Sequence, residues 1–222
     1  MGIGTGIIEA LLDFFFPPRC PKCRAYVEKK GGWCEECLRE VICAARLPLP
    51  PEAAKVFRAV WAAGHYRGGM QNLIRGLKYH GKWGNLAYIR TVLDACGRCL
   101  QDIPASAVAV PVPLHPARER QRGFNQAELI FRPWLKDLGI PMERLLLRNR
   151  QTKPQYGLSR EEREANLQGA FSLAEGMSAD GRDILLVDDI MTTGATLLAC
   201  ANALRQGGAG RIYGFVLASD RG

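Results

Sequence analysis

The stretch from Ile184 to Leu197 constrains the fold of this chain more than any other part of its sequence. It begins with four aliphatic residues, Ile184 to Val187, a pattern typical of a strand buried on both faces in a parallel sheet. Asp188 and Asp189 follow at the carboxyl end of this strand, where open α/β sheets place their ligands. After a short turn, a helical pattern has apolar residues at Leu197, Leu198, Ala201 and Leu204. The sequence therefore predicts a parallel α/β sheet with a polar site at its edge.

The turn itself consists of small and hydroxylated residues, namely Thr192, Thr193, Gly194, Ala195 and Thr196. Backbone N–H groups, threonine hydroxyls and a helix N-terminus suit a single anion, and the paired carboxylates suit a vicinal diol or a metal ion. A phosphate site beside a diol site corresponds to a ribose 5-phosphate. Because the turn contains no lysine, it does not match the phosphate loop of nucleoside triphosphatases. The alternative is an ordinary strand-to-helix turn with polar residues at its cap.

Length and charge limit the number of domains and the kind of partner that the chain can have. A chain of 222 residues fits one medium domain with a small appendage, and no apolar stretch reaches the length that spans a membrane. The formal net charge of +8 favours anionic partners such as polyphosphorylated ligands, nucleic acid or acidic lipid. A basic, solvated surface without a partner is the alternative.

The eight cysteines raise the question of redox compartment. The N-terminal residues carry no basic segment or cleavage site of a signal peptide, and residues 7–16 fit a short amphipathic helix whose Phe14, Phe15 and Phe16 dock on the body. Membrane association of this helix is the alternative. We therefore expect a cytoplasmic protein, in which cysteines stay reduced and serve as metal ligands or buried thiols.

Four of the cysteines have the spacing of a structural zinc site. Cys20 and Cys23 form one Cys-x-x-Cys knuckle, and Cys34 and Cys37 form a second one ten residues further on. Four thiolates complete a tetrahedral site with no open position, so the predicted zinc is structural, and the segment depends on it to fold. The remaining candidates, Cys43, Cys96 and Cys99, fit buried thiols better than a second metal site.

The Pro-rich segment 47–51 separates this module from the main domain. We predict an N-terminal helix and zinc-ribbon-like module at residues 1–47 and a main domain at 52–222, divided into a hood or flap segment (52–104) and a core (105–222). In the hood, residues 56–66 predict one or two strands, and Gly68-Gly69 opens a helix. That helix ends at Leu77–Lys82, which fits either a flap over an anionic or aromatic ligand or a capped helix end with exposed cations.

A second polar stretch follows the short apolar strand predicted at 107–112. It carries Arg118, Arg120, Arg122 and Gly123, and guanidinium groups pair with phosphate oxygens in a bidentate fashion, so the stretch suits a pyrophosphate. Arg118 and Arg122 are the best candidates, although Arg120 or Arg122 fits a surface charge equally well. A third stretch, 148–160, is long, polar and typical of a lid, with Lys153 and Gln155 as candidate ligands.

These stretches together resemble a known family. Residues 184–197 resemble the phosphoribosyl pyrophosphate (PRPP) motif of the type I phosphoribosyltransferases. Pro111 to His115 with Arg118 to Gln126, Gln151 to Ser159 with Arg163 and Asn166, Leu77 to Gly81 and the four-cysteine module are similar to the ComF (ComFC-like) family. The likeness covers nearly the whole chain. One departure is Cys43, which stands alone where many members carry another cysteine pair, so a second zinc site stays open.

Strands predicted near 107–112, 144–148, 183–188 and 211–218 alternate with helices, which predicts a right-handed parallel sheet flanked by helices. The resemblance implies that this sheet is type I phosphoribosyltransferase-like. It implies that Asp188 and Asp189 bind the ribose hydroxyls of PRPP with Mg²⁺, and that Thr192 to Thr196 hold the 5-phosphate. It also implies that Arg118, Arg122, Lys153 and Gln155 contact the pyrophosphate. The family's role is in natural competence, DNA uptake or DNA utilisation, with single-stranded DNA and DNA-uptake proteins as candidate partners.

Two classes of function stay open. One is an enzyme that transfers phosphoribosyl from PRPP to an acceptor and releases pyrophosphate. The other is a PRPP-binding or DNA-associated accessory protein without turnover. We favour the second, because the chain ends soon after its last predicted strand and any acceptor pocket must come from residues 56–100. No catalytic residue, acceptor or oligomeric state follows from the sequence.

Overall fold

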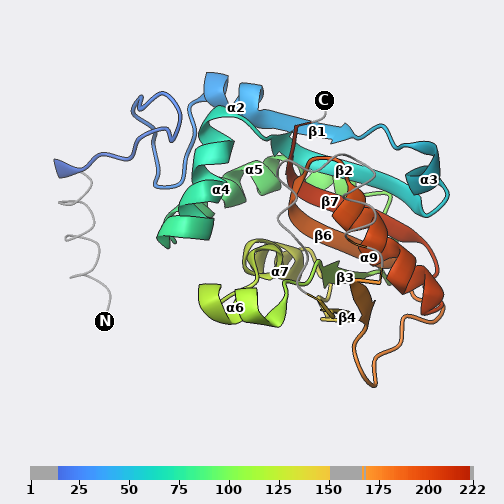
Figure 1. The fold of residues 1–222 in the computed structure, drawn as a ribbon. Coiled ribbons are helices and arrows are strands. Elements are labelled where there is room, and N and C mark those ends of the chain that lie inside the picture. Colours follow the sequence, from blue (N-terminus) through green and yellow to red (C-terminus); the bar gives the residue numbers. More distant parts are fainter. Residues whose placement is uncertain (1–14, 151–166, 168, 221–222) are drawn as a thin grey trace, which may run out of the picture.

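The computed structural model describes residues 15–150, 167 and 169–220. A five-stranded sheet in the order β1-β2-β7-β6-β3 forms its centre (Figure 1). Its strands are β1 (Ile42–Arg46), β2 (Phe57–His65), β3 (Val108–Pro111), β6 (Ile184–Met191) and β7 (Ile212–Ser219). All neighbouring pairs are parallel except β1 and β2, which are antiparallel. The structure confirms the predicted α/β sheet and adds an antiparallel edge strand.

Helices cover both faces of the sheet. One face packs against α4 (Gly68–His80), α5 (Asn85–Ala95) and α7 (Gln126–Asp137), and the other packs against α9 (Ala195–Gln206) and the short α3 (Pro51–Ala54). The central strands β6 and β7 therefore lie between two apolar layers, which explains why Ile184 to Val187 are all aliphatic and fully buried. A 3₁₀ turn, η1 (Gly97–Leu100), follows α5.

The strand predicted at 144–148 is the main error in the predicted sheet. Only residues 146–148 form a strand, β4 (Leu146–Arg148), and it pairs antiparallel with β5 (Phe171–Leu173) in a separate two-stranded sheet. The chain touches β3 just before this point, through a single bridge between Ala109 and Met142. Pro141 precedes the bridge and has no N–H group to extend a ladder.

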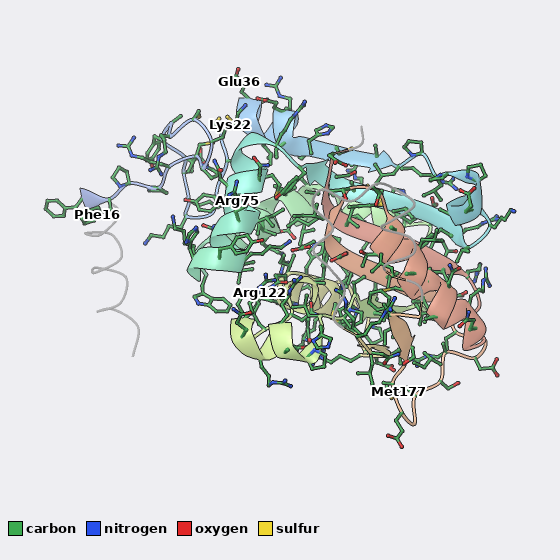
Figure 2. The ribbon with its side chains drawn as sticks, viewed as in Figure 1. Phe16, Lys22, Glu36, Arg75, Arg122 and Met177 are labelled. Carbon is green, nitrogen blue, oxygen red and sulfur yellow. The ribbon has the colours of Figure 1, made fainter. Side chains whose placement is uncertain are left out.

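The zinc-ribbon-like module docks on α5. The indole N–H of Trp33 donates to the carbonyl of Tyr88 at 3.0 Å, and the hydroxyl of Thr91 donates to the carbonyl of Gly31 at 2.8 Å. The buried residues of the module join the core under α4 and α5, and helix α2 (Glu35–Val41) leads directly into β1. Residues 42–46, part of the predicted N-terminal module, thus form the edge of the main sheet. Most of the predicted helix at 7–16 lies outside the described residues, and Phe16 at its end is exposed (Figure 2).

Gly31 gives a direct test of this docking. Its φ of +80° lies in the left-handed region, and a Cβ there would lie 2.5 Å from the Cβ of Ala87 and 2.9 Å from its carbonyl carbon. We expect Gly31→Ala to lower the free energy of unfolding by about 2–4 kcal/mol, because backbone strain and overpacking add. A Cβ at Gly97 meets no atom within 4 Å, so Gly97→Ala is the matched control. Urea unfolding that gives equal stabilities for the two variants would contradict this account.

Candidate functional site at the carboxyl edge of the sheet

Strand β6 places its two carboxylates on opposite faces of the sheet. Side chains alternate along a strand, so Asp189 follows Leu185 and Val187 onto the face covered by α4, α5 and α7. Asp188 follows Leu186 onto the face covered by α9. Asp189 is buried and Asp188 is partly buried. The predicted acidic pair therefore presents one carboxylate to each side of the sheet edge.

Asp189 forms a buried ion pair with Lys78, which lies in the last turn of α4. Lys78 Nζ is 2.6 Å from Asp189 Oδ2, and the two side chains are 16% and 10% exposed. Among the described residues, Oδ2 accepts no hydrogen bond of ordinary geometry. Burial acts to lower the pKa of Lys78, but the attraction of Asp189, with Asp188 adding to it, raises that pKa instead, so the ammonium is charged. Lys78 lies in the segment Leu77–Lys82, which was predicted as a flap or a capped helix end, and its pairing with Asp189 was not predicted.

Asp188 has a different environment. Its Oδ1 accepts the backbone N–H of Asp189 at 2.8 Å. Burial and the negative charge of Asp189 raise the pKa of Asp188, and Lys78 opposes them. Arg148, at the end of β4, is partly buried; burial and repulsion by Arg118 lower its pKa, while the charge of Asp188 acts in the opposite direction. Arg148 is the first residue of the lid-like stretch 148–160, and no individual role was predicted for it.

The predicted phosphate loop forms the start of α9. Gly194 is the N-cap, with a left-handed φ of +81°, and the helix begins at Ala195. The hydroxyl of Thr193 accepts the backbone N–H of Ala195 at 3.4 Å. A glycine is needed at this cap because other residues adopt a positive φ at a cost. The loop residues Thr192 to Thr196 thus lie at a helix N-terminus directly after β6, as predicted from their spacing.

The arginine-bearing polar stretch after β3 forms a short helix, α6 (Pro116–Arg122). His115 Nδ1 accepts the N–H of Ala117 at 3.3 Å, and Gly123 ends the helix with a left-handed φ. Arg118 and Arg122 are four residues apart and share one face, whereas Arg120 points elsewhere. Burial lowers the pKa of Arg122, and Asp189 opposes that effect, which places this guanidinium within the electrostatic reach of the acidic pair.

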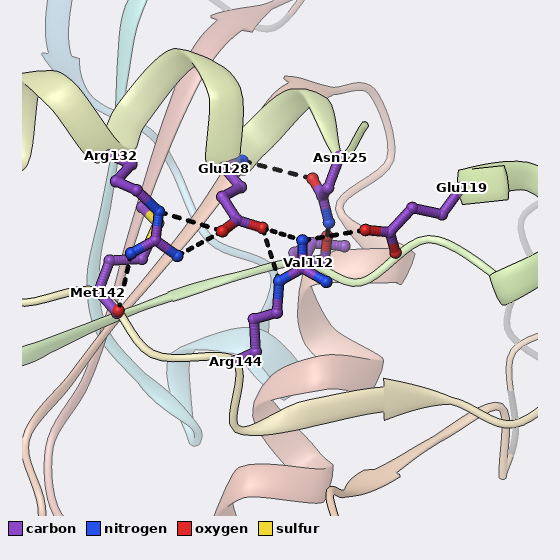
Figure 3. Close-up of polar contacts among 7 residues, drawn as sticks. All are labelled: Val112, Glu119, Asn125, Glu128, Arg132, Met142 and Arg144. Atoms are coloured by element: carbon purple, nitrogen blue, oxygen red, sulfur yellow. Dashed lines mark hydrogen bonds and ion pairs between the residues drawn. The ribbon is translucent and has the colours of Figure 1, made fainter. Parts of the chain in front are cut away.

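A polar network fixes α6 against α7 (Figure 3). Arg144 pairs with Glu119 of α6 at 3.0 Å and donates from Nε to Glu128 of α7 at 2.7 Å. Arg132 also donates to Glu128, and Asn125 donates to the carbonyl of Val112 at 2.9 Å while it caps α7. The network holds the arginine helix at the end of β3. Next to it, a hollow of about 600 Å³ lies between β4 and α6.

The end of α4 covers this edge of the sheet. The guanidinium of Arg122 lies 5.8 Å from the ring centroid of Tyr79, and the rings of Trp83 and Phe124 lie 4.8 Å apart. Tyr79 and Trp83 remain 67% and 51% exposed. Residues 78–83, called the "flap segment" below, thus contact both Asp189 and Arg122, and Gly81 caps the exposed end of α4. The flap and the capped helix end both stay predictions. Lys153 and Gln155 lie outside the described residues.

The four predicted zinc ligands gather in one cluster. The Sγ atoms of Cys20, Cys23, Cys34 and Cys37 all lie within 4.8 Å of one another. Burial acts to raise the pKa of Cys20, but backbone N–H groups of Cys23, Cys34 and Lys22 outweigh it and lower that pKa to about 6. Hydrogen bonds of this kind favour the thiolate that a metal requires.

The other predicted thiols are not part of such a cluster in the described chain. Cys96 donates to the carbonyl of Ala63 at 3.3 Å, and Cys99 donates to that of Ala44 at 3.4 Å. Burial, with smaller contributions from Cys99 and Cys43, raises the pKa of Cys96 to about 12. A neutral, hydrogen-bonded thiol is the form that this environment favours.

The described residues thus combine a four-thiolate metal module with an α/β domain that gathers carboxylates and cations at one sheet edge. A family model described as "Double zinc ribbon domain" matches residues 11–51. Competence protein F of Haemophilus influenzae is 30% identical over 225 residues, covering 98% of this chain and 90% of that protein. The chain therefore belongs to the family of competence protein F, and its four clustered cysteines form a structural zinc site.

Two further relatives match a smaller part of the chain, one of them at lower sequence identity. The DNA utilization protein YhgH of Salmonella typhi is 27% identical over 202 residues, which cover 87% of this chain and 86% of that protein. Competence protein ComFC of Bacillus subtilis is 36% identical over 111 residues, 50% of this chain and 43% of that protein. Among solved structures, adenine phosphoribosyltransferase from Leishmania tarentolae is 15% identical and covers 63% of this chain and 73% of that chain, with a TM-score of 0.36. Within the described residues, no helix has the length and apolar character needed to cross a membrane.

Removal of one zinc ligand tests the metal module. Cys23 is exposed, so Cys23→Ser removes a thiolate with little change in packing. We expect the purified protein to carry about one zinc ion and the variant to lose it, with a lower melting temperature, because four protein ligands are needed to close the site. Cys43→Ser should retain the metal. Elemental analysis that finds no zinc in the gently purified wild type would contradict the assignment.

Proposed function

We propose that this chain binds PRPP together with Mg²⁺ at the carboxyl edge of β6. The observation that carries the proposal is the grouping at one edge of two carboxylates, a hydroxyl-bearing helix start and several cations: Asp188, Asp189, Thr192 to Thr196, Lys78, Arg118, Arg122 and Arg148. PRPP carries a ribose diol, a 5-phosphate and a pyrophosphate, and each has a complementary group here. Helix N-termini and guanidinium groups favour phosphate, and carboxylates accept from hydroxyls.

In this proposal, Asp188 and Asp189 bind the ribose side, and Thr192 to Thr196 hold the 5-phosphate. Arg118 and Arg122 take the pyrophosphate with Lys153 and Gln155. The donor set also fits magnesium, because Mg²⁺ prefers oxygen ligands, and the buried Oδ2 of Asp189 accepts no well-directed hydrogen bond from the described chain. When bound, Mg²⁺ would neutralise charge on the pyrophosphate oxygens.

We further infer a role in natural competence or DNA utilisation. The support is the set of relatives named for these processes, of which competence protein F matches this chain over nearly its whole length. The zinc site and the neutral thiols suit the cytoplasm, where cysteines stay reduced.

Calorimetry with PRPP and Mg²⁺ tests the binding site. We expect Asp188→Asn to weaken PRPP binding by about 10- to 150-fold, because a charge-assisted hydrogen bond contributes about 1.5–3 kcal/mol. Glu175 lies in an exposed turn, so Glu175→Gln is a control that should bind as the wild type does. The proposal fails if the wild type shows no heat of binding with PRPP and Mg²⁺, or if the two variants bind alike.

An active phosphoribosyltransferase is the second candidate. The observation in its favour is the exposed aromatic pair Tyr79 and Trp83 in the flap segment, beside Arg122, which offers a stacking surface to a nitrogenous acceptor. Pyrophosphate release from PRPP with a nucleobase or a nucleic acid, abolished by Asp189→Asn, would establish turnover. Binding without release would leave a PRPP-responsive accessory protein, which is the function we favour.

A basic hollow favours single-stranded DNA as a partner. A space of about 610 Å³ lies between the first zinc knuckle and α4, and Lys22, Arg24, Arg75, His80, Lys82 and Tyr88 line it without any acidic residue. Figure 2 labels Lys22 and Arg75, which come from the module and from α4. Lys22 pairs with Glu40, but Arg24, Arg75 and Lys82 form no ion pair with the described residues. Cations that form no ion pair with the described residues, together with the ring of Tyr88, suit a phosphate backbone with stacking bases.

Charge reversal tests the DNA contact. We expect Arg75→Glu with Lys82→Glu to weaken binding of a fluorescent single-stranded oligonucleotide and to reduce the slope of log K against log salt by about 2, one for each lost phosphate contact. The matched control is Lys55→Glu with Arg58→Glu, since these two exposed cations lie at a separate basic hollow. Equal effects of both pairs on anisotropy titrations would refute a specific contact at α4.

A further inference from the structure

We propose that Lys78 is a built-in counter-cation of Asp189, which keeps free divalent cations out of the site and leaves this carboxylate when PRPP arrives with Mg²⁺. The identity of the incoming ligand rests on the proposed function. The exclusion of free cations rests on the ion pair alone, and it can be tested without PRPP.

The first argument is the position of the ammonium group. Lys78 Nζ lies 2.6 Å from Asp189 Oδ2, so the ammonium occupies one coordination position of that oxygen. A divalent cation that binds through this position must displace Lys78. A cation that binds elsewhere on the same carboxylate is repelled by the nearby ammonium.

The second argument is the burial of both partners. The side chains are 16% and 10% exposed, so neither charge is well solvated when the pair separates. Breaking a buried pair without a replacement is costly, because one uncompensated charge remains in a poorly polar environment. A solitary Mg²⁺ must compete with Lys78 and also lose part of its hydration, whereas PRPP brings phosphate groups that can receive the released ammonium.

The place of Lys78 in the chain extends the consequence to the flap segment. Lys78 is in the last turn of α4, which ends at Gly81 with a left-handed φ of +57°. Tyr79 contacts Arg122, and Trp83 contacts Phe124 on the far side of that glycine. Release of Lys78 from Asp189 removes the one buried ion pair that ties α4 to β6 in the described chain, so ligand binding and the position of the flap segment are coupled.

The test uses the full-length, zinc-loaded protein and Mn²⁺ as a paramagnetic substitute for Mg²⁺, without PRPP. We expect electron paramagnetic resonance titrations to show no specific Mn²⁺ binding to the wild type. Lys78→Met should bind Mn²⁺ at least about tenfold more tightly, because it leaves a buried carboxylate without its cation. Adding Asp189→Asn to this variant should abolish the gain. Lys136→Met, an exposed lysine on α7, is the charge-matched control and should behave as the wild type.

Two results would overturn the proposal. One is a folded Lys78→Met variant that binds Mn²⁺ no better than the wild type. The other is tight Mn²⁺ binding by the wild type that Asp189→Asn removes, and this result needs no Lys78 variant, so it decides the question even if Lys78→Met does not fold. Failure of PRPP to bind would be seen separately in calorimetry and would leave the Mn²⁺ result intact.

Discussion

The buried end of β6 is the constraint on which the rest of the site depends. The strand lies between two apolar layers, so the carboxylates of Asp188 and Asp189 near its end are poorly solvated. Side-chain alternation then sends Asp189 to one face and Asp188 to the other, so that two separate sets of cations are required. Lys78 supplies the charge on the α4 face, while Arg148 lies within electrostatic reach of Asp188. The folded chain thus surrounds its acidic pair with cations because buried charges must be compensated.

The packing of α6 against α7 holds Arg118 and Arg122 in position. Arg118 and Arg122 share a face of α6, a helix fixed at its start by His115 and Pro116 and at its end by Gly123. Arg144 ties α6 to α7 through two carboxylates, and α7 is anchored in the core by Phe131 and Trp134 against Phe215. An anion that meets these arginines encounters charges already in place, so little ordering cost remains for binding.

Periodicity and spacing were sufficient to predict the sheet, the acidic edge, the helix after it and the zinc cluster. Each of these depends on contacts close in sequence or on residue types with one dominant chemistry, such as paired Cys-x-x-Cys knuckles. The strand expected at 144–148 was assigned to the wrong sheet. Its apolar residues fit the central sheet and the small β4–β5 sheet equally well, so the sequence alone does not decide its partner. Pro141 lacks the N–H group that an extended ladder with β3 would need. The pairing of Lys78 with Asp189 joins residues more than a hundred positions apart, and no local pattern encodes it. The residues at 151–166, with Lys153 and Gln155, lie outside the described part of the chain.

The zinc module and the acidic edge meet through the α4–α5 pair. The module holds α5 by hydrogen bonds at Tyr88 and Thr91 and by the close approach of Gly31 to Ala87. Helix α4 packs on α5, and Asn85 at the start of α5 donates to the carbonyl of Leu73 in α4 at 2.8 Å. Lys78 lies little more than one turn beyond that carbonyl. The four-cysteine module and Lys78 are therefore joined through one continuous set of contacts, from Gly31 and Trp33 through α5 to the last turns of α4.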